Sequence, residues 1–214
     1  MSSPMLQVVG LSCERDDHDI FHNLSFSLQS GEILQIDGPN GAGKTSLIRI
    51  LSGLLQSSEG GVYWQGEDIA EDRSAYNKAM LYLGHCTGIN PSLTPLENLQ
   101  WLAAIHTHLD STLIPSALKS VALEGYEDVP CHQLSAGQNR RVSLARLYMS
   151  CATFWLLDEP FTAIDRQGVG MLESQMQRHA SRGGCVILTT HHVLPESMCR
   201  RTLSLRGNGS YVIN

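Results

Sequence analysis

The sequence predicts an α/β domain with a mixed core sheet, an N-terminal antiparallel β subdomain and a helical subdomain. Two continuous apolar runs, at 154–157 and 186–188, are typical of parallel strands that helices cover on both faces. A β-prone run at 32–36 leads through a glycine-rich loop into a helical pattern. The 214 residues suffice for one domain with a sizeable core, and its helical part is expected at about 90–150.

Strands are predicted close to the N-terminus. Residues 6–11 are β-prone, and 15–19 form a polar, turn-like stretch. In 21–28, apolar residues alternate with serines towards the end, which is the pattern of a half-buried strand. An antiparallel sheet is therefore predicted before the core, and a further short strand is expected at 62–64.

A glycine-rich loop separates the β-prone run from the first helical pattern. Its residues are Gly38, Pro39, Asn40, Gly41, Ala42, Gly43, Lys44 and Thr45, with Ser46 next in the helix. Glycine, four residues and Gly-Lys-Thr form the P-loop pattern, in which backbone N–H groups and a helix N-terminus face a phosphate. Lys44 is expected to reach the β- and γ-phosphates of a nucleotide, and Thr45 to ligate Mg²⁺. The alternative is a chance glycine turn, which the matching strand and helix disfavour.

Helix signals dominate the middle of the chain. A buried-type strand at 80–83 ends at a glycine, and Thr94 and Glu97 then form a capping pair around a proline. Apolar residues follow at helical spacing: Leu96, Leu99, Leu102 and Ile105. A second helix is expected at 116–123, so this stretch is predicted to be a helical insertion. Further helices are expected from about Gly137 and at 167–180, and the tail at 202–213 predicts a hairpin.

An acidic pair, Asp158 and Glu159, directly follows the apolar strand at 154–157. At this place in a P-loop enzyme, Asp158 is expected to hold Mg²⁺, largely through water. Glu159 is one residue further on, so we expect it to polarise the attacking water as general base. The alternative is an ordinary acidic turn at the end of a strand, and the upstream P-loop makes that alternative weak.

A second glycine-bearing helix N-terminus lies at Leu134-Ser135-Ala136-Gly137-Gln138. Such a helix start suits an anion, although a serine cap without ligand explains the same residues. With this motif just before the Asp-Glu strand, the sequence resembles ABC-type ATPases. The resemblance implies that Ser135 and Gly137 contact the γ-phosphate held by the P-loop of a partner subunit. A head-to-tail homodimer with two shared ATP sites is therefore expected. Alanine at 136, where the family usually has glycine, is a departure.

The resemblance also assigns residues further along the chain. Asp165 matches the position that bridges the two halves of the dimer. His191 follows an apolar strand and matches the histidine that contacts the γ-phosphate, whereas its neighbour His192 carries no such match. Two positions depart from the family. Cys86 stands where a metal-sensing glutamine is usual, and the aromatic residue that stacks on adenine is missing. Arg15 lies close to that position, either as a stacking guanidinium or as a solvated charge.

Within the family, the chain resembles the haem exporter ATP-binding subunits of bacterial cytochrome c maturation. The resemblance rests on the P-loop run, the Leu-Ser-Ala-Gly-Gln variant, 158–165 and 81–85, and it covers nearly the whole chain. It implies a single ABC ATP-binding domain over 1–214 that uses ATP and Mg²⁺. Such a subunit is peripheral on the cytoplasmic face of the bacterial inner membrane, works with integral membrane subunits, and involves haem only indirectly. The alternatives are an ATPase subunit of a lipid or peptide exporter and, less favoured, a non-transport ABC ATPase.

Bulk properties exclude several other classes of protein. A net charge of −6 argues against a nucleic-acid partner, because binding phosphate backbones needs clustered Lys and Arg. No apolar run approaches the roughly 20 residues that span a bilayer. The six cysteines show no Cys-x-x-Cys spacing, so we expect reduced core residues. His106 and His108, two apart on the predicted insertion, are not expected to share a helix face, and Cys131-His132 is interpreted as a partly buried loop pair.

Overall fold

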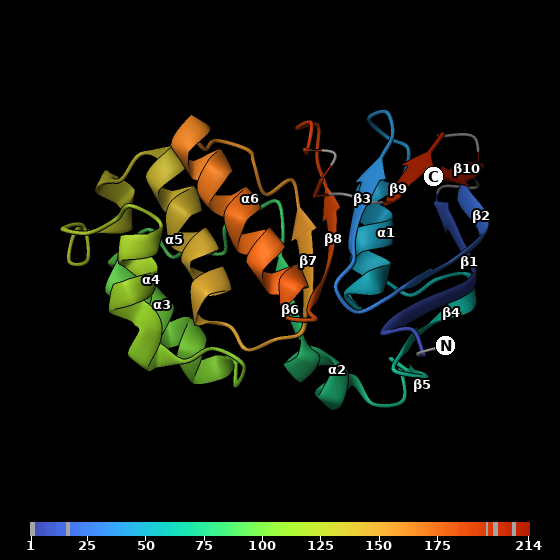
Figure 1. The fold of residues 1–214 in the computed structure, drawn as a ribbon, viewed down its shortest axis with the longest axis horizontal. Coiled ribbons are helices and arrows are strands. Elements are labelled where there is room, and N and C mark those ends of the chain that lie inside the picture. Colours follow the sequence, from blue (N-terminus) through green and yellow to red (C-terminus); the bar gives the residue numbers. More distant parts are fainter. Residues whose placement is uncertain (1–2, 16–17, 196, 199–200, 207–208) are drawn as a thin grey trace.

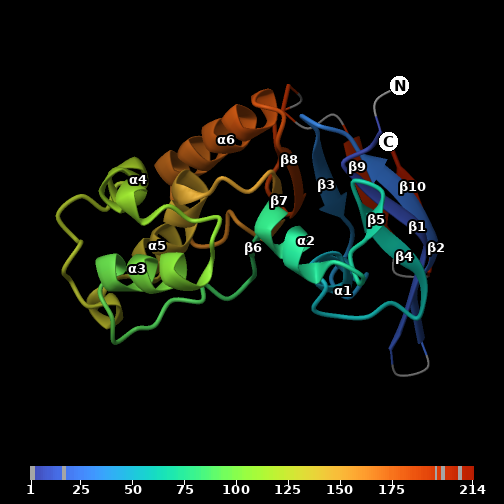
Figure 2. The ribbon, with the colours of Figure 1, turned by 90° about the horizontal axis from the view of Figure 1, so that it is seen from below.

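Two β-sheets and a group of helices make up the chain (Figure 1). The computed structural model describes residues 3–15, 18–195, 197–198, 201–206 and 209–214. The helices α3, α4 and α5 lie beyond the core sheet, on the side away from the N-terminal sheet, and the view from below agrees (Figure 2). The predicted division into a core, an antiparallel sheet and a helical part is confirmed.

The smaller sheet is antiparallel, with strand order β2-β1-β4-β5. Its strands are β1 (Leu6–Arg15), β2 (His18–Leu28), β4 (Glu59–Trp64) and β5 (Glu67–Asp68). In β2, the predicted alternation is confirmed, because Leu24, Phe26 and Leu28 are buried while Ser25 is exposed. One side of the strand therefore packs inwards and the other faces solvent.

The larger sheet has the order β10-β9-β3-β8-β7-β6. Its strands are β3 (Ile33–Asp37), β6 (Met80–Leu83), β7 (Phe154–Asp158), β8 (Cys185–Thr189), β9 (Arg201–Leu205) and β10 (Tyr211–Ile213). All neighbours pair in parallel except β10, which is antiparallel to β9, so the sheet is mixed as predicted. Every residue of β7 and β8 is buried, which explains their continuous apolar sequences.

Helices cover both faces of the core sheet. They are α1 (Lys44–Leu51), α2 (Arg73–Ala79), α3 (Pro95–Ile105), α4 (Ile114–Ser120), α5 (Ala136–Met149) and α6 (Arg166–Ser181), with 3₁₀ turns at Ser111–Leu113 and Cys131–Gln133. Successive residues of β7 serve the two faces. Trp155 and Leu157 pack into the cluster with the insertion helices, whereas Phe154 and Leu156 pack with α1 and the antiparallel sheet.

Two details of the insertion differ from the prediction. The second helix spans 114–120 rather than 116–123, because Val121 is its C-cap and Ala122 takes a left-handed φ of 56° that ends it. The predicted stripe on α3 is buried at Leu99 and Leu102, but Ile105 is 53% exposed in the last turn. The capping pair of Thr94 and Glu97 is confirmed at the other end of α3.

Candidate nucleotide-binding site

The P-loop connects the end of β3 to the first turn of α1. Gly43 is the N-cap of α1, with a left-handed φ of 98°, and as a glycine it offers no side chain to cap the helix. Gly38 has a φ of 141°, and a Cβ there would collide with the carbonyl oxygen of Leu205. The N–H groups of the first turn of α1 are therefore left for a ligand to satisfy.

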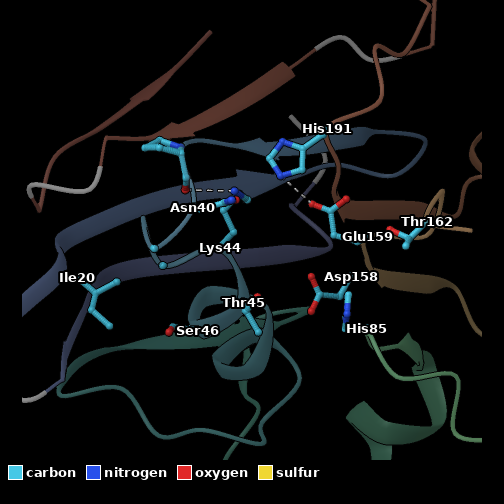
Figure 3. A pocket seen from close by; sticks show the side chains of 13 residues that line it. Ile20, Asn40, Lys44, Thr45, Ser46, His85, Asp158, Glu159, Thr162 and His191 are labelled. Carbon is cyan, nitrogen blue, oxygen red and sulfur yellow. Dashed lines mark hydrogen bonds and ion pairs between the residues drawn. The ribbon is translucent and has the colours of Figure 1, made fainter.

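A cavity of about 600 Å³ opens beside this turn (Figure 3). Its lining brings together most of the residues predicted from the P-loop: Pro39, Asn40, Gly41, Gly43, Lys44, Thr45 and Ser46. Asp158, Glu159 and His191 line the opposite side, so segments more than a hundred residues apart share one space. Gly38 and Ala42 lie behind the lining, with Ala42 buried and the carbonyl of Gly38 turned to Lys44.

Lys44 is held by its own loop. Its Nζ donates to the carbonyl oxygens of Gly38 at 2.6 Å and Pro39 at 3.2 Å. Only 9% of the residue is exposed, so the ammonium group lies within the cradle of the loop. A lysine placed in this way adds a fixed positive charge to the N–H groups of α1.

The acidic pair lies where β7 ends, next to the end of β8. Thr189, opposite Asp158 in the sheet, donates its hydroxyl to Asp158 Oδ1 at 2.7 Å and accepts the Glu159 N–H at 2.9 Å. Glu159 has a left-handed φ of 49°, which is uncommon for a residue with a side chain. Its Oε1 lies 3.6 Å from His191 Nε2, and the two side chains point towards one another (Figure 3).

Arg140 supports this turn from α5 and was not anticipated from the sequence. Its guanidinium donates to the carbonyls of Glu159 at 2.8 Å and Gly84 at 3.2 Å, and the residue is 3% exposed. Burial lowers the pKa of Arg140, while the Asp158 and Glu159 carboxylates act to raise it. The sequence holds one indication of this burial, because Arg140 is spaced to lie on the same helix face as the apolar residues Leu144 and Leu147.

The motif predicted to serve a partner lies outside the cavity. Ser135 is the N-cap of α5; its Oγ accepts the Gln138 N–H at 3.2 Å, and its N–H donates to Gln138 Oε1 at 2.9 Å. A Cβ at Gly137 would lie 2.8 Å from the Ala163 carbonyl oxygen, so only glycine fits beside that turn. Neither Ser135 nor Gly137 lines the cavity of its own chain.

Asp165 also lies apart from the cavity, and 61% of its side chain is exposed. It caps α6 by accepting the Gly168 N–H at 2.8 Å and pairs with Arg141 at 2.6 Å. These two contacts, the Gly168 bond first, lower the pKa of Asp165. The carboxylate is therefore ionised and held in place at neutral pH.

Three residues of the lining were not predicted as site residues: Ile20, His85 and Thr162. His85 precedes Cys86 in the loop where the family usually has glutamine, and it is His85 that lines the cavity while Cys86 is exposed. Ile20 is an aliphatic residue of the lining, whereas the family resemblance predicts an aromatic residue in the first loop. The side chain of Arg15 lies outside the described part of the chain.

The family assignment follows from comparison with known proteins. The family described as "ABC transporter" matches residues 21–162. The "Cytochrome c biogenesis ATP-binding export protein CcmA" of Pseudomonas fluorescens (strain Pf0-1) is 54% identical over 91% of this chain and 92% of its own. The protein of the same name from Yersinia pestis bv. Antiqua (strain Nepal516) is 53% identical over 89% and 87%. The chain belongs to the ABC transporter family, among its cytochrome c biogenesis ATP-binding export proteins. This ABC ATPase is thus an ATP-hydrolysing transporter subunit.

Solved structures agree on the fold of the ABC ATPase. An ATP-binding subunit of an ABC transporter superposes with a TM-score of 0.86 at 23% identity, over 97% of this chain and 89% of that one. A putative ABC transporter ATP-binding protein from Pyrococcus furiosus gives 0.80 at 24% identity, over 94% and 96%. Within the described residues, no helix is long and apolar enough to cross a bilayer.

Proposed function

We propose that this chain powers a membrane complex of cytochrome c maturation that exports haem or releases a haem-loaded chaperone. In this proposal, the single domain over 1–214, with its helical subdomain at about 90–150, is peripheral on the cytoplasmic face of the bacterial inner membrane. It works with integral membrane subunits and meets haem only indirectly. The relatives named for cytochrome c biogenesis support the process. The observation that carries the ATPase chemistry is the single cavity shared by Lys44, Asp158, Glu159 and His191.

ATP binding is proposed to use the open turn of α1. The triphosphate lies along the loop from Gly38 to Ser46, where backbone N–H groups and the Lys44 ammonium meet its β- and γ-phosphates. The Thr45 hydroxyl and the Asp158 carboxylate line the same space and are the hard oxygen ligands that Mg²⁺ prefers. Thr189 occupies only Oδ1 of Asp158, which leaves Oδ2 for a cation. Bound Mg²⁺ neutralises charge that builds up on the phosphate oxygens.

Hydrolysis is proposed to start at Glu159. Its carboxylate accepts a proton from water as the water oxygen attacks the γ-phosphorus, and the bond to the β–γ bridging oxygen breaks to release ADP and phosphate. His191, 3.6 Å from Glu159, donates to the γ-phosphate and holds the carboxylate in its orientation. Arg140 and Thr189 fix the backbone of the turn that carries Glu159.

The nucleotide site is proposed to be completed by a second copy of the chain. Ser135 and Gly137 of each copy contact the γ-phosphate bound by the other, and Asp165 bridges the two. The position of Ser135 outside the cavity of its own chain supports this arrangement. The Oγ of Ser135 accepts from Gln138, so its hydroxyl hydrogen is available for donation to a phosphate.

The test combines two measurements on the intact protein. Wild-type protein pulled down from detergent-solubilised membranes is expected to bring integral membrane subunits that handle haem. Glu159→Gln is expected to bind ATP, to remain dimeric with it, and to lose at least about 100-fold in kcat. A generic lipid or peptide permease in the pull-down would support the other exporter and contradict the haem assignment. Undiminished hydrolysis by Glu159→Gln would contradict the general-base role.

A further inference from the structure

His192 directly follows His191 in the segment after β8, and it contacts two other parts of the chain. Its Nε2 lies 2.9 Å from Glu173 Oε1 on α6, and its ring centre lies 4.6 Å from that of Phe161. A carboxylate oxygen accepts, so His192 donates this bond through Nε2. Phe161 is buried and lies two residues beyond Glu159. One imidazole thus joins three segments: the end of β8, the turn after β7 and the helix α6.

The backbone around His191 is held from both sides. Thr190 is 1% exposed, and its Oγ1 accepts the His192 N–H at 2.9 Å, which closes a tight turn around His191. Leu194, two residues after His192, is buried in the same core cluster as Phe161. The residues before and after His191 therefore fix the backbone from which its imidazole projects.

His191 is held less firmly than its neighbour. Its side chain is 60% exposed, and its Nε2 lies 3.6 Å from Glu159 Oε1, which is longer than a hydrogen bond (Figure 3). The side chains of His192 and Glu173 are 34% and 21% exposed, and their contact is within hydrogen-bond distance. Of the two histidines, His192 is thus the anchored one.

The reaction proposed above needs the His191 imidazole to stay beside Glu159 and the γ-phosphate. A misplacement of about 1 Å in a catalytic group can cost on the order of 100-fold in rate. His192 does not line the nucleotide cavity, so it is not placed to touch the phosphates itself. Its anchored side chain instead limits how far the backbone of His191 can move.

We propose that His192 is a positioning residue for ATP hydrolysis, which holds the segment after β8 on α6 and on the Phe161 ring so that the His191 imidazole stays at the Glu159 carboxylate. The inference rests on the proposed function, because it takes the roles of Glu159 and His191 from it. It gives a task to a histidine for which the family resemblance provides none. The hydrogen bond needs only a donor at the Nε2 position, which a neutral imidazole with its hydrogen on Nε2 supplies.

Substitutions at the two ends of the hydrogen bond test this role. His192→Leu keeps an apolar group beside Phe161 but cannot donate, so kcat should fall about tenfold while ATP affinity stays within about twofold of wild type. His192→Gln carries an amide N–H in place of the Nε2 donor and should recover most of the wild-type rate. Glu173→Ala removes the acceptor and should resemble His192→Leu. The same change at the exposed Glu71, before α2, is the matched control and should leave the rate unchanged. ATP hydrolysis by the purified full chain and calorimetric titration with ATP are the measurements.

A double-mutant cycle shows through which residue His192 acts. In His191→Ala the group to be positioned is missing, so adding His192→Leu should lower kcat by less than a further factor of about two. Losses that multiply would overturn the inference, because His192 would then serve the fold or another residue. A wild-type kcat in His192→Leu would also overturn it, as would a rate of His192→Gln no higher than that of His192→Leu.

Glu159→Gln distinguishes a failure of this inference from a failure of the proposed function. If Glu159→Gln hydrolyses ATP at the wild-type rate, the proposed chemistry fails, and the inference fails with it. If Glu159→Gln is inactive while His192→Leu keeps the wild-type rate, only the positioning role of His192 fails.

Discussion

Two helix N-termini in this ABC ATPase are proposed to bind phosphate, and their first turns are capped in different ways. The first turn of α1 begins at Gly43, with no side chain capping it. The first turn of α5 begins at Ser135 and is closed by a reciprocal pair of hydrogen bonds with Gln138. The N–H groups at the start of α1 are thus left for a ligand from solution, whereas at the start of α5 the N–H groups of Ser135 and Gln138 are already satisfied within the free chain.

This difference predicts which of the two helix N-termini, that of α1 or that of α5, determines the affinity of the isolated subunit for nucleotide. The α1 tip has Lys44 buried in its loop and lines the cavity, while the α5 tip contributes nothing to that cavity. An isolated subunit should therefore bind ATP through α1 alone. The α5 tip should matter only when a second copy brings it to the triphosphate, which makes turnover depend on both tips.

The largest effect is expected at Lys44. Lys44→Ala removes a charge-assisted contact with the phosphates and should weaken ATP binding by the isolated subunit about 100-fold. Ser135→Ala should leave that binding within about twofold, since the α5 tip is absent from the cavity of its own chain. Calorimetric titration of both variants with ATP checks this. A comparable loss of affinity in Ser135→Ala would break the distinction between the tips.

Mixing two inactive variants sharpens the comparison. Ser135→Ala and Glu159→Gln should each be nearly inactive, yet a mixed dimer has one site with Glu159 and the partner's Ser135 both intact. Random pairing makes half of the dimers mixed, with one of two sites restored, so about a quarter of the wild-type rate is expected. ATP hydrolysis by the equimolar mixture is the measurement. No gain on mixing would show that both residues serve the same chain's site.

A smaller effect is expected on lowering the pH, which should reduce the stability of the fold that carries both helix N-termini. Burial lowers the pKa of His179, stacked on Trp155 with ring centres 3.8 Å apart, to about 4, the same value as for His108. The unfolded chain takes up these protons near the ordinary pKa of about 6.5 and the folded chain does not. Stability should thus be constant above about pH 7 and fall by roughly 1–2 kcal/mol per histidine towards pH 5.

Urea unfolding at pH 7.5 and pH 5 measures that loss. His108→Gln removes one of the two groups, so its stability should fall less between the two pH values than that of wild type. An identical pH dependence in wild type and variant would show that His108 is not a source of the acid sensitivity. The nucleotide affinity of the α1 tip is not expected to follow this loss, because neither histidine lines its cavity.

The smallest expected effect is the change in the free energy of unfolding when a residue at the start of α5 or of α1 is replaced. Without nucleotide, Ser135→Ala removes the cap of α5 and should lower the free energy of unfolding by about 1 kcal/mol. Thr45→Ala, at the exposed start of α1 where no side chain caps the helix, should change it by less than about 0.5 kcal/mol. Chemical denaturation of the two variants tests this. Equal losses would show that α1 is capped after all.

Much of the fold could be predicted from sequence because its signals are local. Alternating apolar residues placed β2, continuous apolar runs placed β7 and β8, and Thr94 with Glu97 located the start of α3. The end of α4 was less accessible, because it depends on Ala122 taking a left-handed conformation that alanine seldom adopts.

The same distinction between local sequence signals and tertiary contacts applies to the candidate site. The sequence by itself determined the P-loop, the acidic pair and the Ser135 cap, because each is a contiguous run whose backbone geometry follows from its own residues. Only the tertiary structure decided that His85 rather than Cys86 lines the cavity, that Arg140 holds the Glu159 turn, and that His192 contacts Glu173 and Phe161. Those contacts join segments tens of residues apart, and they exist only once the sheet and helices have packed.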